Sequence, residues 1–138
     1  MKKKLKILAL NHRCHLHPNT GGSEVNLFEQ AKYWVQYGHD VTIVAEDPGR
    51  EHAPEKNEVY EGIKIIRMGN EYTIYMLGAW YTFQHGHEYD VILDIWNGIP
   101  FFTKLATRTP VTLMQHHIHG PMWFTEFGLP INIVGWSF

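Results

Sequence analysis

The sequence predicts an α/β fold: a Rossmann-like, open and mostly parallel β-sheet with helices on both faces. Three observations predict it. Short, almost wholly apolar stretches, typical of strands buried on both faces of a parallel sheet, recur along the chain. They alternate with segments of helical period, which is the pattern of βαβ units with right-handed crossovers. The chain has 138 residues, 44% hydrophobic and 19% charged, which is enough for one domain with its own core and too few for two.

The first half of the chain predicts one βαβ unit. A strand is expected over residues 5–10, and a second over residues 40–45. The helix between them begins at Ser23 and ends at Gly38, since glycine accepts the left-handed conformation that ends a helix. Its apolar stripe leaves Glu24 among the polar positions and consists of Val25, Leu27, Phe28, Ala31, Trp34 and Val35.

The second half continues the alternation. A third strand with a bend or bulge at Glu61-Gly62 is expected, then a helix, a strand, a short helix and a fifth strand. A last candidate helix covers residues 121–127. The expected ranges are 59–68, 72–84, 89–94, 99–107 and 110–114.

A binding site is expected at one edge of this sheet, because ligands of open parallel sheets bind beyond the carboxyl ends of the strands. The segments placed there are residues 11–22, residue 46 onward, residues 94–98 and residues 115–120. They carry much of the unusual composition: His12, His15, His17, Gly21, Gly22, Asn97, Gly98, His116, His117 and His119.

The most specific feature of that edge is Thr20-Gly21-Gly22-Ser23-Glu24, at the entry to the first helix. Paired glycines let the backbone approach a ligand, and free N–H groups of a first helical turn favour an anion such as a diphosphate. A tight turn with a helix cap explains the same residues and stays open. The spacings G-x-G-x-x-G and G-x-x-x-x-G-K-[ST] are absent, so neither a dinucleotide fingerprint nor a P-loop is predicted.

Composition excludes some classes of partner. With 12 basic and 14 acidic residues, a net charge of −2, the chain offers no surplus of cations for nucleic acid. The apolar stretch near the start is broken by Lys6 and is too short for a secretory leader, and no run is long enough for a membrane span. The single cysteine, Cys14, fits a reducing compartment, so a cytoplasmic protein is expected.

Three segments resemble a known family. Gly21–Val25 (GGSEV), Tyr89–Phe102 (YDVILDIWNGIPFF) and Pro110–Gly120 (PVTLMQHHIHG) are similar, in order and spacing, to the N-terminal domain of retaining GT-B glycosyltransferases of the GT4 type. In that family this domain mainly receives the acceptor, and a C-terminal domain binds the nucleotide-sugar donor. The resemblance implies that residues 1–138 are a truncated acceptor-side domain, inactive without the donor-binding half.

The resemblance also implies roles for residues, with no cofactor and no metal. Gly21 and Gly22 would contact the donor diphosphate, and His116 would stand near the reacting sugar, with His117 as the alternative one residue on. The acceptor, a sugar, a lipid or another hydroxyl compound, would meet a cleft lined by Glu24, Asp94, Asn97 and Gly98.

Other functions are kept as alternatives. One is a non-catalytic, Rossmann-like module that binds a carbohydrate or another partner. Another is a histidine-based metal protein, because His15/His17, His85/His87 and His117/His119 are spaced so that each pair could chelate in an extended segment. The aromatic residues of the C-terminal half are expected in the core or facing the second domain, with Trp123 and Phe124 as candidates for contact with an acceptor or a peripheral membrane surface.

Overall fold

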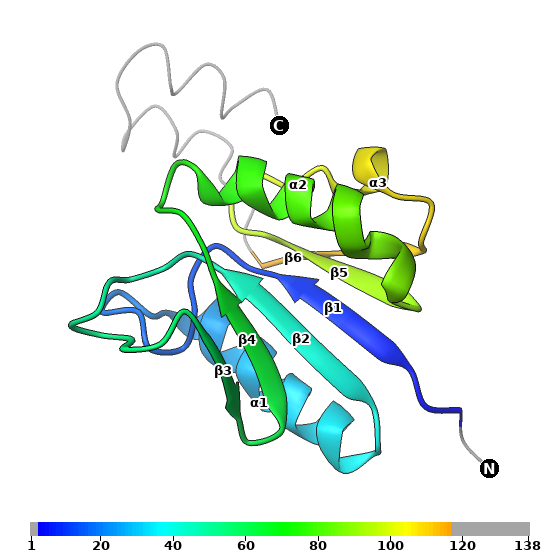
Figure 1. Cartoon of the computed structure of the whole chain (residues 1–138), viewed down its shortest axis with the longest axis horizontal. Coiled ribbons are helices and arrows are strands. Elements are labelled where there is room, and N and C mark those ends of the chain that lie inside the picture. The colour runs from blue at the N-terminus through cyan, green and yellow to red at the C-terminus, as the bar shows by residue number, and fades with distance from the viewer. Residues whose placement is uncertain (1–2, 117–138) are drawn as a thin grey trace.

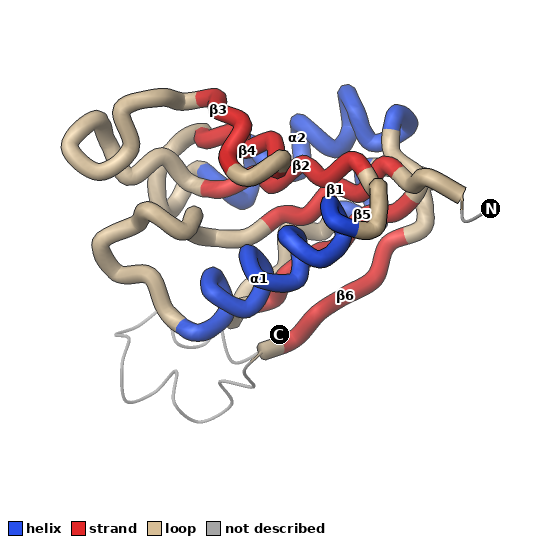
Figure 2. Tube along the Cα trace, turned by 90° about the horizontal axis from the view of Figure 1, so that it is seen from below, coloured by secondary structure: helices blue, strands red, loops and turns tan. Residues whose placement is uncertain are grey.

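A computed structural model describes residues 3–116 and confirms the predicted α/β fold. A six-stranded sheet carries helix α1 on one face and helices α2 and α3 on the other (Figures 1 and 2). The elements are β1 (Lys6–Leu10), α1 (Gly22–Gln36), β2 (Asp40–Ala45), β3 (Asn57–Tyr60), β4 (Ile63–Arg67), α2 (Ile74–His85), the 3-10 turn η1 (Gly86–Glu88), β5 (Val91–Trp96), α3 (Thr103–Ala106) and β6 (Val111–Gln115).

The strand order is that of a Rossmann-like sheet. It runs β3-β4-β2-β1-β5-β6, and every neighbouring pair is parallel except the antiparallel β3–β4. The chain therefore builds outward from β1 through β2 and β4, then returns to the other side of β1 as β5. The topological switch point lies at the carboxyl ends of the neighbouring strands β1 and β5. The loops that follow these two strands diverge there and leave room for a ligand.

The core has two layers, one on each face of the sheet. Alternate residues of β1 point to opposite faces. Ile7 and Ala9 join the cluster under α1, and Leu8 and Leu10 join the cluster under α2. Burial on both faces explains why β1 is apolar throughout.

The third strand differs from the prediction. Residues 59–68 were expected to form one strand with a bulge, and this is wrong: residues 57–67 form the hairpin β3–β4. The chain reverses at Glu61 (φ 50°) and Gly62 (φ 79°). Two successive positive φ values make the two-residue turn whose twist suits a hairpin.

The helices agree with the prediction in position and differ in detail. Helix α1 begins one residue earlier than expected, at Gly22, and Gly38 ends it with φ 91°. Glu24 is buried, although the periodic pattern placed it on the polar face. The helix expected over residues 99–107 is only Thr103–Ala106, and the one expected over 121–127 lies outside the described residues.

Within the described part of the chain, no helix combines the length and apolarity needed to cross a bilayer.

Candidate functional site

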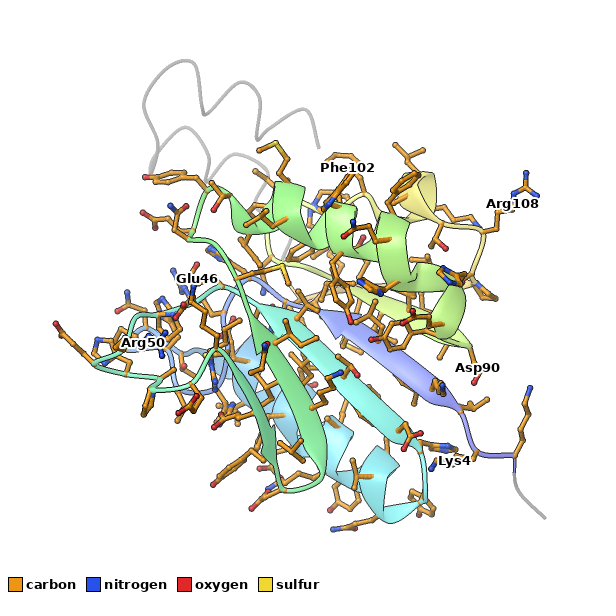
Figure 3. All side chains as sticks on the ribbon, viewed as in Figure 1. Lys4, Glu46, Arg50, Asp90, Phe102 and Arg108 are labelled. Carbon is orange, nitrogen blue, oxygen red and sulfur yellow. The ribbon has the colours of Figure 1, made fainter. Side chains whose placement is uncertain are left out.

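The carboxyl ends of the parallel strands gather the loops that the sequence singled out. The loop after β1 and the loop after β2 lie side by side at this edge, where Figure 3 labels Glu46 and Arg50. Lys4 and Asp90 are labelled at the opposite edge, where β1 and β5 begin. The site described below occupies the first of these two edges.

A chain of hydrogen bonds crosses the switch point between β1 and β5. Asn97, directly after β5, donates through Nδ2 to Asn11 Oδ1 (3.0 Å), directly after β1. The same amide group donates to Ser23 Oγ (2.9 Å) in the first turn of α1. Asn11 Oδ1 also accepts from the backbone N–H of His12 (2.9 Å). Asn97 therefore fixes the start of α1 against both central strands.

Glu24 organises the first turn of α1. Its Oε2 accepts from the backbone N–H of Gly21 (2.7 Å), and its Oε1 accepts from Ser23 Oγ (2.9 Å). Because Gly21 has no side chain, only this half of a capping box forms. Within residues 3–116, the N–H groups of Gly22, Ser23 and Glu24 have no hydrogen-bond partner.

The fold itself does not require the glycine pair. Gly21 is in extended backbone (φ −117°, ψ −166°), which any residue adopts. A side chain at Gly21 would come within 3.3 Å of the flexible carboxylate of Glu24, whereas a Cβ at Gly22 would meet no atom of residues 3–116 within 4 Å. The surface above Gly22 is therefore open to the backbone N–H groups of the first turn, which is the geometry that an anion would use.

Hydrogen bonds and ion pairs within the domain hold the loop between β1 and α1 in place. Thr20 Oγ1 donates to the carbonyl oxygens of Cys14 (3.1 Å) and His17 (2.6 Å). His17 Nε2 lies 2.5 Å from Glu46 Oε1, and His12 Nε2 lies 3.1 Å from Glu46 Oε2, an ion-pair distance without hydrogen-bond geometry. Glu46, buried directly after β2, thus joins the start and the middle of the loop to the neighbouring strand.

Burial dominates the electrostatics of this loop. It lowers the pKa of His12 below the ordinary 6.5, and the attraction of Glu46 for a protonated ring only partly opposes this. The ring of His12 lies against Tyr75 of α2, with centroids 5.6 Å apart. Burial, with Glu46 nearby, raises the pKa of Tyr75 to about 12, so this phenol keeps its proton at neutral pH.

Asp94 is buried below the candidate site, where it holds the loop after β5, and does not line the surface of the site. Its side chain is buried within β5, two residues before the strand ends at Trp96. Oδ1 accepts from the N–H of Phe101 (3.0 Å), and Oδ2 accepts from the N–H (3.2 Å) and the hydroxyl (2.8 Å) of Thr103. These bonds fix the segment before α3, where Phe102 has φ 56°, and α3 begins directly after it at Thr103.

The other predicted residues are distributed around the same edge. Gly98 follows Asn97 with φ 104°, a conformation that favours glycine. His116 directly follows β6, is exposed, and donates its backbone N–H to the carbonyl of Trp96 (3.4 Å). The glycine pair and His116 therefore share one edge of the sheet. His117 lies outside the described residues.

The two histidine pairs within the described residues, His15/His17 and His85/His87, form no metal site. Among residues 3–116, no three side chains of His, Cys, Asp or Glu are arranged to hold a metal ion. His17 is turned to Glu46, whereas His15 stacks on Phe28 and Tyr60, with centroids 4.4 and 5.2 Å away. His85 lies 3.3 Å from Glu88, and His117 and His119 are outside the described range.

Three residues that contribute to this site were not singled out from the sequence: Asn11, Ser23 and Glu46. Asn11 and Ser23 were treated as a loop residue and as a cap, although they complete the bridge to Asn97. Glu46 was noted only as the start of a loop. It is a carboxylate directly after a buried strand, and the adjacent strand is followed by a histidine-rich loop. This combination was a signal from which a contact between the two loops could have been predicted.

Comparison with known proteins identifies no family: the sequence matches no protein-family model and no curated protein.

Proposed function

We propose that this chain is the acceptor-side domain of a GT-B glycosyltransferase, which moves a sugar from a nucleotide-sugar donor to an acceptor hydroxyl. The observation that carries the proposal is the start of α1, at the switch point of a Rossmann-like sheet. In the described part of the chain, nothing obstructs Gly22, and the N–H groups of the first turn are unpaired.

The placement of this turn suits a leaving diphosphate. Negative charge grows on the diphosphate as the glycosidic bond breaks, and oriented N–H groups already in place stabilise it without reorganisation. The positive end of the α1 dipole adds to this stabilisation. Asn97 keeps the turn in position by holding Ser23 and Asn11 together.

The same geometry implies that this domain binds a diphosphate weakly by itself. Glu24 already occupies the N–H of Gly21 and places a carboxylate in the first turn. Only the N–H groups at the next positions remain for an anion. Most of the affinity for the donor must therefore come from a second, donor-binding domain, and this chain would supply the stabilisation specific to the transition state.

His116 has a place in this proposal because it is exposed beyond β6 on the same edge. An imidazole there can donate a hydrogen bond to a hydroxyl of the transferred sugar or accept one from the acceptor. We expect the variant H116A, and more so H116A combined with H117A, to lose most of the transfer activity.

The direct test joins the chain to a donor-binding domain, in a continuous reading frame or in trans, and measures nucleoside diphosphate release from a panel of nucleotide sugars. Gly22→Leu should lower kcat about tenfold or more, because the side chain covers the N–H groups and one oriented donor is worth that much or more. Asn26→Leu, which puts the same leucine side chain at an exposed position of the same helix, should leave the rate unchanged.

A second measurement uses the 138-residue chain alone. Amide resonances of Gly22, Ser23 and Glu24 should shift when a nucleoside diphosphate is titrated, and Gly22→Leu should remove the shifts while keeping the thermal unfolding temperature. Binding of a carbohydrate without turnover in any pairing would instead favour the non-catalytic module. Release unaffected by Gly22→Leu and by H116A with H117A would remove the proposed site.

A further inference from the structure

Helix α2 is mostly apolar, on its exposed face as well as on the face against the sheet, which is unusual for a helix at the surface. Its 12 residues, IYMLGAWYTFQH, include no Asp, Glu, Lys or Arg. The face on the sheet is formed by Ile74, Gly78 and Thr82, one helical turn apart. A helix that packs with one face normally has charged residues on the other.

The opposite face of α2 carries large apolar side chains. Met76, Trp80 and Phe83 follow at the spacing i, i+4, i+7, and their exposed fractions are 72%, 57% and 63%. The rings of Trp80 and Phe83 stack with centroids 5.5 Å apart. Together with Leu77 and Ala79 they line a shallow apolar hollow on the surface. Contiguous exposed patches of this kind mark interaction surfaces.

Helix α3 extends this surface and adds positive charge. Leu105 is 86% exposed, and Phe83, Lys104, Leu105 and Arg108 line one surface depression between α2 and the turn after α3. The two helices lie on the same face of the sheet, and the side chain of Arg108 projects away from the body of the molecule (Figures 1 and 3). The apolar stripe therefore has a basic rim.

The acidic residues of the stretch from α2 to the turn after α3 are engaged elsewhere. Glu88 lies 3.3 Å from His85. Asp90 accepts from the backbone N–H of Lys6 at the start of β1 (2.8 Å), and Asp94 is buried beneath its loop. The chain as a whole has a net charge of −2, so the basic rim is a local feature.

We propose that the α2–α3 face, defined by Met76, Leu77, Trp80, Phe83, Lys104, Leu105 and Arg108, docks on an anionic lipid surface. The apolar side chains enter the boundary between headgroups and acyl chains, and Lys104 and Arg108 pair with lipid phosphates. Tryptophan is favoured at this depth because its ring is both apolar and able to donate a hydrogen bond. This inference does not depend on the proposed sugar transfer.

The arrangement of charge favours a membrane over a second copy of the chain. A symmetric dimer through this face would bring two basic rims together, with no carboxylate of the face to neutralise them. An anionic membrane satisfies the apolar stripe and the rim at once.

The test is co-sedimentation of the full chain with vesicles of phosphatidylcholine, alone or mixed with phosphatidylglycerol. Binding should require the anionic lipid. Lys104→Glu with Arg108→Glu should lower the partition coefficient about tenfold or more, since each basic residue near such a surface contributes several-fold. Trp80→Ser with Phe83→Ser should lower it at least as much.

Two control variants carry matched changes elsewhere. Lys3→Glu with Lys56→Glu alters the net charge equally on exposed residues away from the α2–α3 face, and Val25→Ser with Tyr33→Ser removes exposed apolar groups from α1 on the other face of the sheet. Both should bind as the unmodified chain does. A blue shift of tryptophan emission on binding should disappear in Trp80→Phe, a variant that keeps the ring area needed to bind.

Three results would overturn the inference: no binding to anionic vesicles, equal loss of binding in the control with altered charge, or a dimer in sedimentation equilibrium that Trp80→Ser with Phe83→Ser dissociates. The thermal unfolding temperature of each variant verifies that the effect is not a loss of folding.

Discussion

At the scale of single residues, burial lowers the pKa of two histidines of the β1–α1 loop, His12 and His15. Burial lowers the pKa of His15, nearby Arg67 lowers it further, and the carboxylates of Glu58 and Glu61 oppose this only in part. The ring stacks on both Phe28 and Tyr60, whose centroids lie 5.7 Å from each other. The folded protein therefore prefers the neutral ring, while the unfolded chain has a histidine of ordinary pKa.

This preference gives the folded state a pH dependence with a definite sign. As pH falls below about 6.5, the unfolded state takes up the proton first, so the free energy of unfolding decreases; above that pH the contribution is complete and constant. We expect His15→Phe, which keeps the stacking and removes the titration, to lose less stability than the unmodified chain between about pH 7.5 and 5.5. Urea unfolding at the two pH values measures this.

His52 provides the comparison, because it is exposed on the loop after β2. The variant His52→Phe makes the same replacement away from the rings of Phe28 and Tyr60 and serves as the matched control. An identical dependence for all three proteins would show that His15 does not contribute.

From single residues, the sequence predicted which edge of the sheet carries the candidate site, but not the hydrogen bonds and ion pairs within it. It identified Asn97 and the glycine pair because polar loop residues after buried strands stand out. It did not pair Glu46 with His12 and His17, since those contacts depend on the path that the loop takes after β1 as well as on the pairing of β1 with β2. It also placed Glu24 in solvent, because helical period does not reveal that a backbone N–H three residues earlier would satisfy a buried carboxylate.

At the scale of elements, the β3–β4 hairpin depends on Gly62. Its φ of 79° is strained for other residues, and a Cβ there would lie 2.7 Å from Val35 Cγ1 of α1. We expect Gly62→Ala to lower the free energy of unfolding by about 2 kcal/mol, as strain and overpacking add. Urea unfolding at neutral pH would measure the loss.

The neighbouring turn residue gives the opposite expectation. Glu61 has φ 50° without being glycine, so Glu61→Gly relieves strain and should change stability by no more than about 1 kcal/mol, in the stabilising direction. Equal losses in both variants would contradict the proposed turn geometry.

The hairpin also shows why one element was mispredicted. Residues 59–68 contain enough β-branched residues for a strand, and Glu61-Gly62 is not among the dipeptides most typical of a two-residue hairpin turn. The remaining strands were predicted well because parallel strands buried on both faces have a strong apolar pattern. The sequence predicted a longer helix than α3, because the hydrogen bonds from Phe101 and Thr103 to Asp94 are tertiary contacts that a local pattern does not reveal.

At the scale of the whole molecule, the sheet should be most stable at its centre. Strand β1 is paired on both sides, and Leu8 and Leu10 are fully buried. Strand β3 has one paired neighbour and a mostly exposed surface. Under native conditions, amide hydrogens of β1 should exchange at least about a hundredfold more slowly than those of β3. Similar protection in both strands would indicate that the sheet opens only as a unit.

Arg67 has a consequence for chemical probing of the chain. Its buried guanidinium reaches Cys14 Sγ through Nε (3.4 Å), the carbonyl of Glu55 (2.8 Å) and the carboxylate of Glu58 (2.5 Å). Cys14 is the single thiol of the sequence. An alkylating reagent can reach this sulfur only when the loop or the hairpin separates from the body of the domain. The native protein thus contains its own reporter group, and the rate at which the thiol is alkylated measures how often that corner opens.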